Sequence, residues 1–174
     1  MLTETTLPQG VMEGKGSYNK HAAIPAAGAA LARPFLEQAV RDANLEPEGD
    51  PLLIADYGSS EGKNSLLPVQ LAVRCVRQRV QPDRAMFVFH VDQPSNDFNS
   101  LFAVLSAHPN RYTLDDPNVF PCAIGRSFYQ RVLPPNSVHI GLVFVCRSVA
   151  KSPAFEDSRS LPRILRHGRC ACRL

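Results

Sequence analysis

The sequence has no long hydrophobic run, no recognisable leader and few cysteines. Its longest apolar stretch, near Val138 to Val145, is far shorter than the roughly 20 residues of a membrane-spanning helix. The first residues, MLTETTLPQG, have neither the basic segment nor the apolar core of a signal peptide. The five cysteines are scattered along 174 residues, which indicates reduced thiols rather than a disulfide framework. We therefore expect one cytoplasmic domain without a membrane partner.

The sequence also lacks a basic surface of the kind that binds nucleic acid. Its formal net charge is +3, yet residues 1–141 carry 12 basic and 14 acidic side chains. The surplus lies in the last 33 residues, which carry 7 basic and 2 acidic side chains. No aromatic residues interleave with Arg74, Arg77 and Arg79, so we expect these three to form a solvated helix face. Charge therefore gives no reason to expect a nucleic-acid partner.

Two common phosphate-binding patterns are missing from the most informative stretch, LLIADYGSSEGKN (52–64). Its apolar run is typical of a buried parallel strand, and Asp56 and a glycine-rich loop follow. Gly58 and Gly62 enclose only three residues, so the Walker pattern does not fit, and G-x-G-x-x-G is absent. The pattern that remains, D-x-G-x-x-x-G, is typical of loops that hold S-adenosylmethionine. An ordinary glycine turn is the alternative.

A second apolar segment, residues 85–92 (AMFVFHVD), also ends in an acid. In doubly wound folds, an acid at the end of the second strand accepts hydrogen bonds from the ribose hydroxyls of a cofactor. Asp92 is thus a candidate ribose ligand, with a simple strand-end turn as the alternative. The segment between the two strands has apolar residues at helical spacing, which predicts a helix with one buried face. These residues are Leu66, Val69, Val73, Val76 and Val80.

The remaining patterns predict alternating helices and strands. We expect a helix restarted by Pro34 that continues through Leu36, Val40 and Ala43. The other expected elements are a strand at 52–58, a helix at 64–80, strands at 85–92 and 119–124, a helix at 96–107, a helical turn at 127–131 and a strand from 137. This order is that of an α/β fold with a parallel sheet.

Four motifs in order resemble the SABATH methyltransferases, the family of salicylic acid, jasmonic acid and caffeine-type enzymes. They are MEGKGSYNKH (12–21), IADYGSSEGKN (54–64), DQPSNDFNSLF (92–102) and RSFYQRVLPPNSVH (126–139). The resemblance covers residues 11–141, about two-fifths of a usual family member. It implies an incomplete Rossmann-like class I methyltransferase fold: the first three or four strands of a mostly parallel seven-stranded sheet. The helical cap that forms the family's acceptor pocket has no counterpart here.

The resemblance assigns S-adenosyl-L-methionine as cofactor and gives binding roles to residues that match the family motifs. Tyr18 would contact the cofactor, Asn64 would face its methionine moiety and Asp92 its ribose. Ser59 stands where the family usually has cysteine, and Gln93 where it usually has leucine beside the adenosine. The full set is Tyr18, Asp56, Gly58, Ser59, Asn64, Asp92, Gln93, Ser127 and Phe128. Phe128 would border the adenine, with a core aromatic as the alternative.

The chemistry that the resemblance implies is methyl transfer to the carboxylate of a small organic acid. A carboxylate is already ionised at neutral pH, so no general base is needed and no side chain is assigned as catalytic. Correct positioning of the two reactants and exclusion of water from the site would supply the rate enhancement. We also expect no metal site, because His21, His90, His108 and His139 lack metal-ligand spacing. Polar partners at loop or strand ends are the expected role of these histidines.

Two departures from the family motif weigh against activity. Ala22 stands at the position of a serine that approaches the cofactor, and Pro25 at that of a glutamine that binds the substrate carboxylate. Proline has neither the amide side chain of glutamine nor a backbone N–H, so the substrate carboxylate would lose a hydrogen bond worth about 1–3 kcal/mol. Two hypotheses therefore remain: an inactive methyltransferase fragment, or a non-catalytic binding or dimerisation protein that forms a homodimer.

The last residues differ from the family in a way that indicates a frameshift near Gly141. One permissible coding of residues 142–151, read one base later, gives W-S-S-Y-A-V-Q-W-L, which is close to the family motif S-S-Y-x-x-x-W-L-S. We therefore expect residues 1–141 to be the cofactor-binding part and residues 142–174 to be an out-of-frame, poorly ordered tail. On this hypothesis the His167–Cys172 stretch, HGRCAC, is not a metal site.

Overall fold

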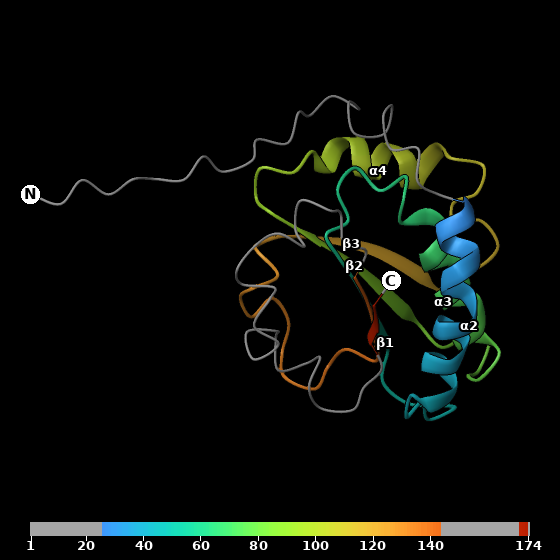
Figure 1. The fold of residues 1–174 in the computed structure, drawn as a ribbon. Helices are drawn as coiled ribbons and strands as arrows, with labels where there is room; N and C mark the ends of the chain where they lie inside the picture. Colours follow the sequence, from blue (N-terminus) through green and yellow to red (C-terminus); the bar gives the residue numbers. More distant parts are fainter. Residues whose placement is uncertain (1–25, 144–170, 174) are drawn as a thin grey trace, which may run out of the picture.

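The computed structural model describes residues 26–143 and 171–173, with side chains from residue 33 to residue 143. Helices and strands alternate along the chain, as expected for an α/β fold (Figure 1). The elements are α2 (Ala26–Asp42), β1 (Leu52–Tyr57), α3 (Leu66–Arg77), β2 (Met86–Asp92), α4 (Phe98–Ala107), β3 (Val119–Gly125), β4 (Ile140–Val143) and β5 (Ala171–Arg173).

The strands form one parallel sheet in the order β3-β2-β1-β4-β5. From β1 the chain moves outward through β2 to β3, then returns to the other side of β1 as β4. The strand order therefore reverses between β1 and β4. In open α/β sheets, ligands bind outside the carboxyl ends of the strands at such a reversal. The topology alone thus predicts a ligand site at the carboxyl end of β1 and in the loop that follows it.

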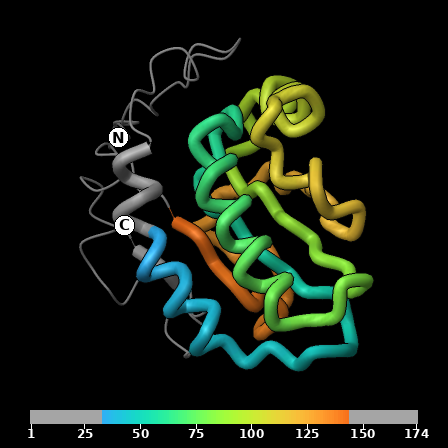
Figure 2. Tube along the Cα trace, turned by 90° about the vertical axis from the view of Figure 1, so that its right-hand side faces the viewer, coloured from blue at the N-terminus to red at the C-terminus, as the bar shows by residue number. Residues whose placement is uncertain are grey.

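All three helices contribute to the core on one face of the sheet. Side chains of α2, α3 and α4 cluster there with alternate residues of β1 and β2. Figure 1 shows α2 and α3 side by side against the sheet, and Figure 2 shows α3 in front of it. Two right-handed β-helix-β crossovers in the same direction place α3 and α4 on the same face. The largest fully buried side chains include Leu36, Leu52, Ile54, Met86, Leu101, Ile140 and Leu142.

The opposite face of the sheet carries a smaller cluster. Ala55 and Tyr57 of β1 and Val91 of β2 pack there with Leu133 and Val138 from the segment before β4. Because side chains alternate along a strand, Asp56 and His90 point to the helix-covered face instead. Asp56 and Tyr57, which are neighbours at the end of β1, therefore face opposite sides of the sheet.

One helix differs from its prediction. The sequence predicted that Pro34 restarts a helix, but α2 runs unbroken from Ala26 to Asp42 with Pro34 inside it. An interior proline costs a helix about 3 kcal/mol. Leu36 and Val40 are buried in the core, and this packing offsets the cost.

The predicted solvated face of arginines is also wrong for two of its three members. Arg77 forms a salt bridge with Asp116 at 2.8 Å, and its side chain is only 18% exposed. Arg79 donates to the carbonyls of Val40, Arg41 and Ala43 at the end of α2. Arg74 is the member that remains largely exposed.

Part of the predicted tail belongs to the sheet. β4 runs past the boundary expected after Gly141, because Leu142 lies in it with 1% exposure. Residues 171–173 form β5, parallel to β4. The other residues of the predicted tail lie outside the described residues, so the expectation of an irregular segment stays a prediction for them.

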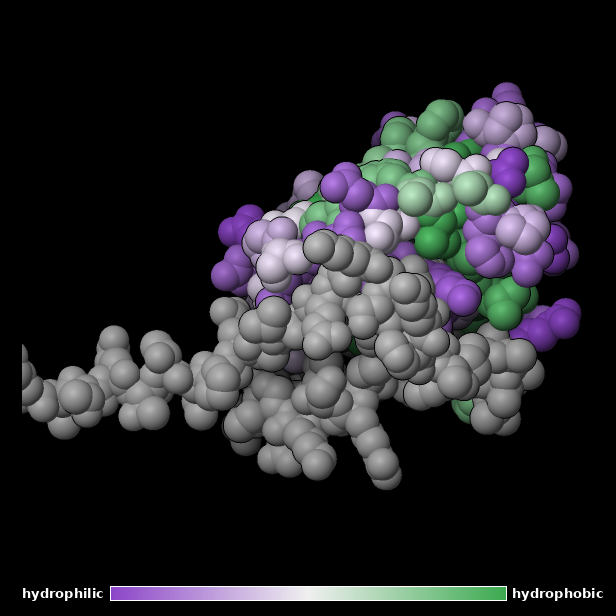
Figure 3. Space-filling model, turned by 90° about the horizontal axis from the view of Figure 1, so that it is seen from above, coloured by the Kyte–Doolittle hydropathy of each residue, from purple (hydrophilic) through white to green (hydrophobic). Residues whose placement is uncertain are grey.

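The surface of the described residues mixes polar and apolar side chains. Figure 3, seen from above Figure 1, shows hydrophobic residues in green among hydrophilic ones in purple. Exposed large hydrophobic residues of the helices are Phe35, Leu67 and Phe102. Within residues 26–143 and 171–173, no helix is long and apolar enough to cross a membrane.

Candidate functional site

The loop after β1 turns sharply at three residues with positive φ. These are Gly58 (φ 83°), Ser60 (φ 50°) and Gly62 (φ 86°). The N–H of Gly58 donates to the carbonyl of Val91 at 2.8 Å, so the loop is bound to the end of β2. A Cβ on Gly62 would come within 2.5 Å of Leu101 Cδ1, so α4 packs directly against the loop. The predicted glycine loop is therefore a fixed turn between two strands and a helix.

Asp92 lies at the centre of this turn. Its Oδ2 accepts the N–H of Ser60 at 2.7 Å, and its Oδ1 accepts the N–H of Gln93 at 2.7 Å. Burial raises the pKa of the Asp92 carboxyl, the two N–H groups lower it, and the charge of Asp56 raises it further. Each carboxylate oxygen keeps a second lone pair. Asp92 is thus held in place and still able to accept two more hydrogen bonds.

The S-N-D-F-N motif fixes the other side of the loop. Asn96 Nδ2 donates to the carbonyl of Ser60 at 2.8 Å. Asp97 is the N-cap of α4, and its side chain accepts the N–H of Ser100 at 3.0 Å. A Cβ on Gly125, at the end of β3, would lie 3.4 Å from the ring of Phe98. Successive motif residues therefore join the loop, α4 and β3.

Phe128 closes the opposite side of the loop. A Cβ on Gly58 would lie 3.7 Å from Phe128 Cε1, so the ring lies close to the loop backbone. The ring also packs edge-on against Tyr57, with 6.5 Å between centroids. The N–H of Arg126 donates to the Asp92 carbonyl at 2.7 Å, which anchors this segment to the end of β2. Residues 127–130 form a turn closed by the Gln130 N–H on the Ser127 carbonyl at 3.0 Å, in place of the expected helical turn.

Several buried polar atoms near this turn have no hydrogen-bond partner. They are Tyr57 Oη, Ser59 Oγ and Ser60 Oγ, on side chains that are at least nine-tenths buried. Burial raises the pKa of Tyr57 to about 12, so its hydroxyl remains a donor at neutral pH. An unpaired buried polar group costs about 1–3 kcal/mol. A polar ligand that supplies partners would remove part of this cost, so the residues fit a polar cofactor.

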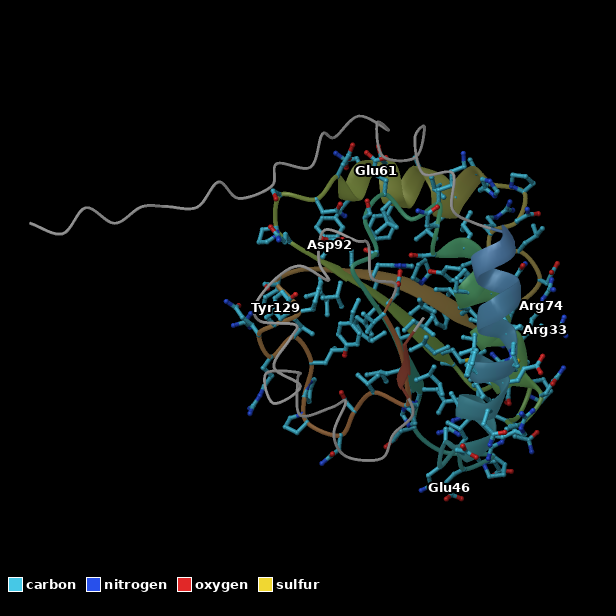
Figure 4. All side chains as sticks on the ribbon, viewed as in Figure 1. Arg33, Glu46, Glu61, Arg74, Asp92 and Tyr129 are labelled. Carbon is cyan, nitrogen blue, oxygen red and sulfur yellow. The ribbon has the colours of Figure 1, made fainter. Side chains whose placement is uncertain are left out.

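The structure brings together most of the predicted site residues. Gly58, Ser59 and Asp92 lie within the hydrogen-bonded turn, Gln93 follows it, and Phe128 packs against it. Asn64 and Ser127 are partly exposed beside these elements. Figure 4 shows Asp92 and Glu61 at the end of the molecule opposite Glu46. Tyr18 and Pro25 lie outside the described residues, and so does Ala22.

Unlike the other described residues predicted to bind the cofactor, Asp56 has its side chain in the core. Its side chain is fully buried on the helix-covered face, where Oδ2 lies 2.9 Å from Nδ1 of His90. Nε2 of His90 lies 2.8 Å from the hydroxyl of Tyr112. His90 thus has the polar partners that the sequence predicted, but it lies within β2 rather than at a strand end. The prediction of a polar partner at a loop or strand end is confirmed in full elsewhere. It holds for His108 and His139, whose Nδ1 atoms accept backbone N–H groups of Asn110 and Leu53.

Sequence reasoning missed the contacts of Asn96, His90 and Tyr112. An asparagine and an aspartate before an apolar run signal a turn and a helix cap, so Asn96 could have been suspected. His90 and Tyr112 gave no such signal, because their pairing depends on the register of β1 with β2. Among the described residues, no group of three His, Cys, Asp or Glu side chains could hold a metal ion.

A parallel sheet with its reversal beside β1, a glycine turn and an acid at the end of β2 define a Rossmann-like, cofactor-binding domain. The comparison with family models agrees. The model of the S-adenosylmethionine-dependent carboxyl methyltransferases matches residues 5–150, and the chain belongs to this family, known as SABATH. The cofactor of the family is S-adenosyl-L-methionine.

Known relatives match over about three quarters of the chain or more. A methyltransferase of a Fusarium species, LUC1, is 34% identical over 136 residues, which is 75% of this chain and 36% of the relative. Gibberellic acid methyltransferase 1 of Arabidopsis thaliana is 32% identical over 74% of this chain and 35% of its own length. The farnesoic acid carboxyl-O-methyltransferase of Arabidopsis thaliana is 30% identical over 82% of this chain and 40% of its own length.

A solved structure shares the fold. Loganic acid methyltransferase with S-adenosylhomocysteine superposes with a TM-score of 0.60 and 29% identity. The match covers 76% of this chain and 38% of that protein. The chain thus spans little more than a third of the length of the relatives it matches.

Proposed function

We propose that residues 11–141 form the cofactor-binding part of a carboxyl methyltransferase and that the turn after β1 holds S-adenosylmethionine. The observation that carries this proposal is the placement of Asp92. Its carboxylate is fixed by the N–H groups of Ser60 and Gln93 and can still accept two hydroxyls. Vicinal ribose hydroxyls match such a carboxylate, one hydroxyl for each oxygen.

The other residues of the site would hold the remaining parts of the cofactor. Phe128 would supply an apolar surface for the adenine next to Gly58, where the absence of a Cβ leaves room. Asn64 and Ser59 would contact the methionine part, as the family resemblance implies. The cofactor itself supplies a methyl group on a sulfonium sulfur.

The complete protein would transfer this methyl group to the carboxylate of a small organic acid. The bound cofactor would supply an electrophilic methyl group, which the carboxylate oxygen would take up to give a methyl ester and S-adenosylhomocysteine. A carboxylate needs no base to ionise at neutral pH. The protein would contribute orientation and exclusion of water.

For the 174-residue chain itself we propose binding without methyl transfer. Alanine at position 22 and proline at position 25 cannot make the cofactor and substrate contacts of the family motif. Residues 142–174 would be translated out of frame. The alternative function is that of a non-catalytic binding or dimerisation protein that forms a homodimer.

A transfer assay tests the proposal. The 174-residue chain and a full-length family member are incubated with S-adenosylmethionine carrying a radiolabelled methyl group and a panel of small carboxylic acids, and labelled esters are counted. We expect esters from the full-length protein alone. Label in esters above background from the 174-residue chain would overturn the proposal that it is inactive. Sedimentation of the same samples tests for a homodimer.

A further inference from the structure

We propose that His90 and Tyr112 are positioning residues that hold the cofactor loop in its binding geometry through Asp56. The three side chains form a continuous hydrogen-bonded network inside the protein. Asp56 Oδ2 lies 2.9 Å from His90 Nδ1, and His90 Nε2 lies 2.8 Å from the Tyr112 hydroxyl. The exposed fractions of Asp56, His90 and Tyr112 are 0%, 0% and 3%.

The directions of the hydrogen bonds in this network follow from the Tyr112 hydroxyl. Burial and the charge of Asp56 raise the pKa of Tyr112, so its hydroxyl stays protonated and can donate to Nε2 of His90. Neutral histidine then carries its proton on Nδ1 and donates it to Asp56. His90 and Tyr112 are both satisfied in this arrangement, and Asp56 is bonded through Oδ2. The Asp56 carboxylate depends on His90, because its other oxygen, Oδ1, has no hydrogen-bond partner among the described residues.

The network lies directly below the loop. Asp56 and His90 are register partners in neighbouring strands, and the next anchor along the strands is the bond from the Gly58 N–H to the Val91 carbonyl. Loss of the Asp56–His90 bond would leave a buried charge without a partner, two residues before Gly58. Such a charge moves to find water, and the end of β1 would move with it.

Tyr112 extends the support to α4. It lies in the connection between α4 and β3, and α4 contacts the loop through Leu101 against Gly62. The Tyr112 hydroxyl thus joins the segment that follows α4 to β2, and His90 extends the connection to Asp56 of β1. The charge of Asp56 also acts on Asp92, the proposed ribose ligand. The inference rests on the proposed function, because the loop is proposed to bind the cofactor. The effect of the network on the loop can nevertheless be measured without any cofactor.

Hydrogen exchange of the loop amides provides that measurement. In the 174-residue chain, exchange of the Gly58 and Ser60 amides is compared with that of the Leu52 amide, which bonds the Ala85 carbonyl at the other end of β1. Tyr112→Phe removes only the hydroxyl. We expect it to raise the exchange of the loop amides relative to Leu52 by about tenfold, the effect of one lost buried hydrogen bond.

Two controls separate positioning from general destabilisation. Val119→Ala removes buried volume at the amino end of β3, in register with Met86 and Leu52 and so beside the reference amide, and should not raise the ratio. His90→Gln can keep a donor to Asp56 and an acceptor for Tyr112, whereas His90→Leu keeps neither. The ratio should therefore rise more in His90→Leu than in His90→Gln. An unchanged ratio in both Tyr112→Phe and His90→Leu would overturn the inference.

Titration with S-adenosylhomocysteine completes the test. Tyr112→Phe should weaken binding by about tenfold, and Val119→Ala should not. If the unmodified chain binds no S-adenosylhomocysteine, the proposed function fails while the exchange ratio still decides the inference. If the unmodified chain binds and Tyr112→Phe binds equally well, the inference fails and the proposed function stands.

Discussion

Asp92 accepts two backbone N–H groups, so the protein itself orients its carboxylate. The sequence could predict this residue, because an acid at the end of the second strand is a local pattern. The sequence could not show that Ser60 and Gln93 hold it. Those bonds depend on the positive φ of Ser60 and on the way the loop folds back onto β2. The Asp56–His90–Tyr112 network depends on the register of β1 with β2, which the sequence could not show either.

The pH dependence of cofactor binding should follow Asp92. Burial raises the pKa of this carboxyl above its usual 3.8, so it takes up a proton at a higher pH than an exposed aspartate. Ribose hydroxyls need the ionised form as acceptor. We therefore expect S-adenosylhomocysteine affinity to fall on acidification through this raised pKa. Asp92→Asn should remove this part of the pH dependence, as calorimetric titrations at several pH values would show.

The stability of the free protein should change with pH in the opposite sense. The folded pKa of Asp92 lies above the unfolded one, so the folded state binds more protons between the two values. The contribution of Asp92 to stability therefore grows as pH falls through this window, while cofactor affinity declines. Urea unfolding of the unmodified chain and of Asp92→Asn across the window would measure this difference. An equal pH slope in both proteins would contradict it.

At the scale of elements, Gly62 allows the loop after β1 to pack closely against α4. A Cβ at this position would meet Leu101 Cδ1 at 2.5 Å, and the φ of 86° is strained for alanine by about 1–2 kcal/mol. Gly62→Ala should lower stability and weaken S-adenosylhomocysteine binding. Gly49→Ala is the matched control, because its φ is 116° but its Cβ would meet only Arg84 at 3.9 Å. It should lower stability and leave binding unchanged.

Arg79 joins α2 to the end of α3. Its guanidinium donates to carbonyls at the carboxyl end of α2, including that of Ala43 at 3.0 Å, where a positive charge also favours the helix dipole. Arg79→Ala should cost about 1.5–3 kcal/mol in chemical unfolding. Arg74→Ala should cost less than about 1 kcal/mol, because Arg74 is exposed and lies 3.7 Å from Asp115. Equal losses would show that Arg79 does not support α2.

The order of the elements was predictable, but some of their limits were not. Alternating apolar runs and helical spacing predicted β1, α3, β2, α4 and β3 to within a few residues. The prediction at Pro34 failed because local propensity indicates a break, whereas packing of α2 on α3 and the core decides the outcome. Arg77 and Arg79 were misread because their carboxylate and carbonyl partners come from distant parts of the chain.

At the scale of the whole molecule, the family model matches residues 5–150, and the chain covers about a third of the length of its relatives. We predict that the nucleotide sequence has an alternative frame near the codon of Gly141. A shift of one base there should restore W-S-S-Y and an open frame beyond it. Sequencing of the genomic and transcript regions checks this, and a closed frame after every single-base shift would refute it.

The most direct test of the account is calorimetric titration of S-adenosylhomocysteine into the folded 174-residue chain. We predict saturable binding, and we predict that Asp92→Ala weakens it by about 1.5–3 kcal/mol because the ribose hydroxyls lose their charged acceptor. Arg74→Ala, at an exposed position on α3, should bind like the unmodified chain. Absence of binding by a chain shown to be folded, or equal binding by Asp92→Ala, would contradict the proposed cofactor site.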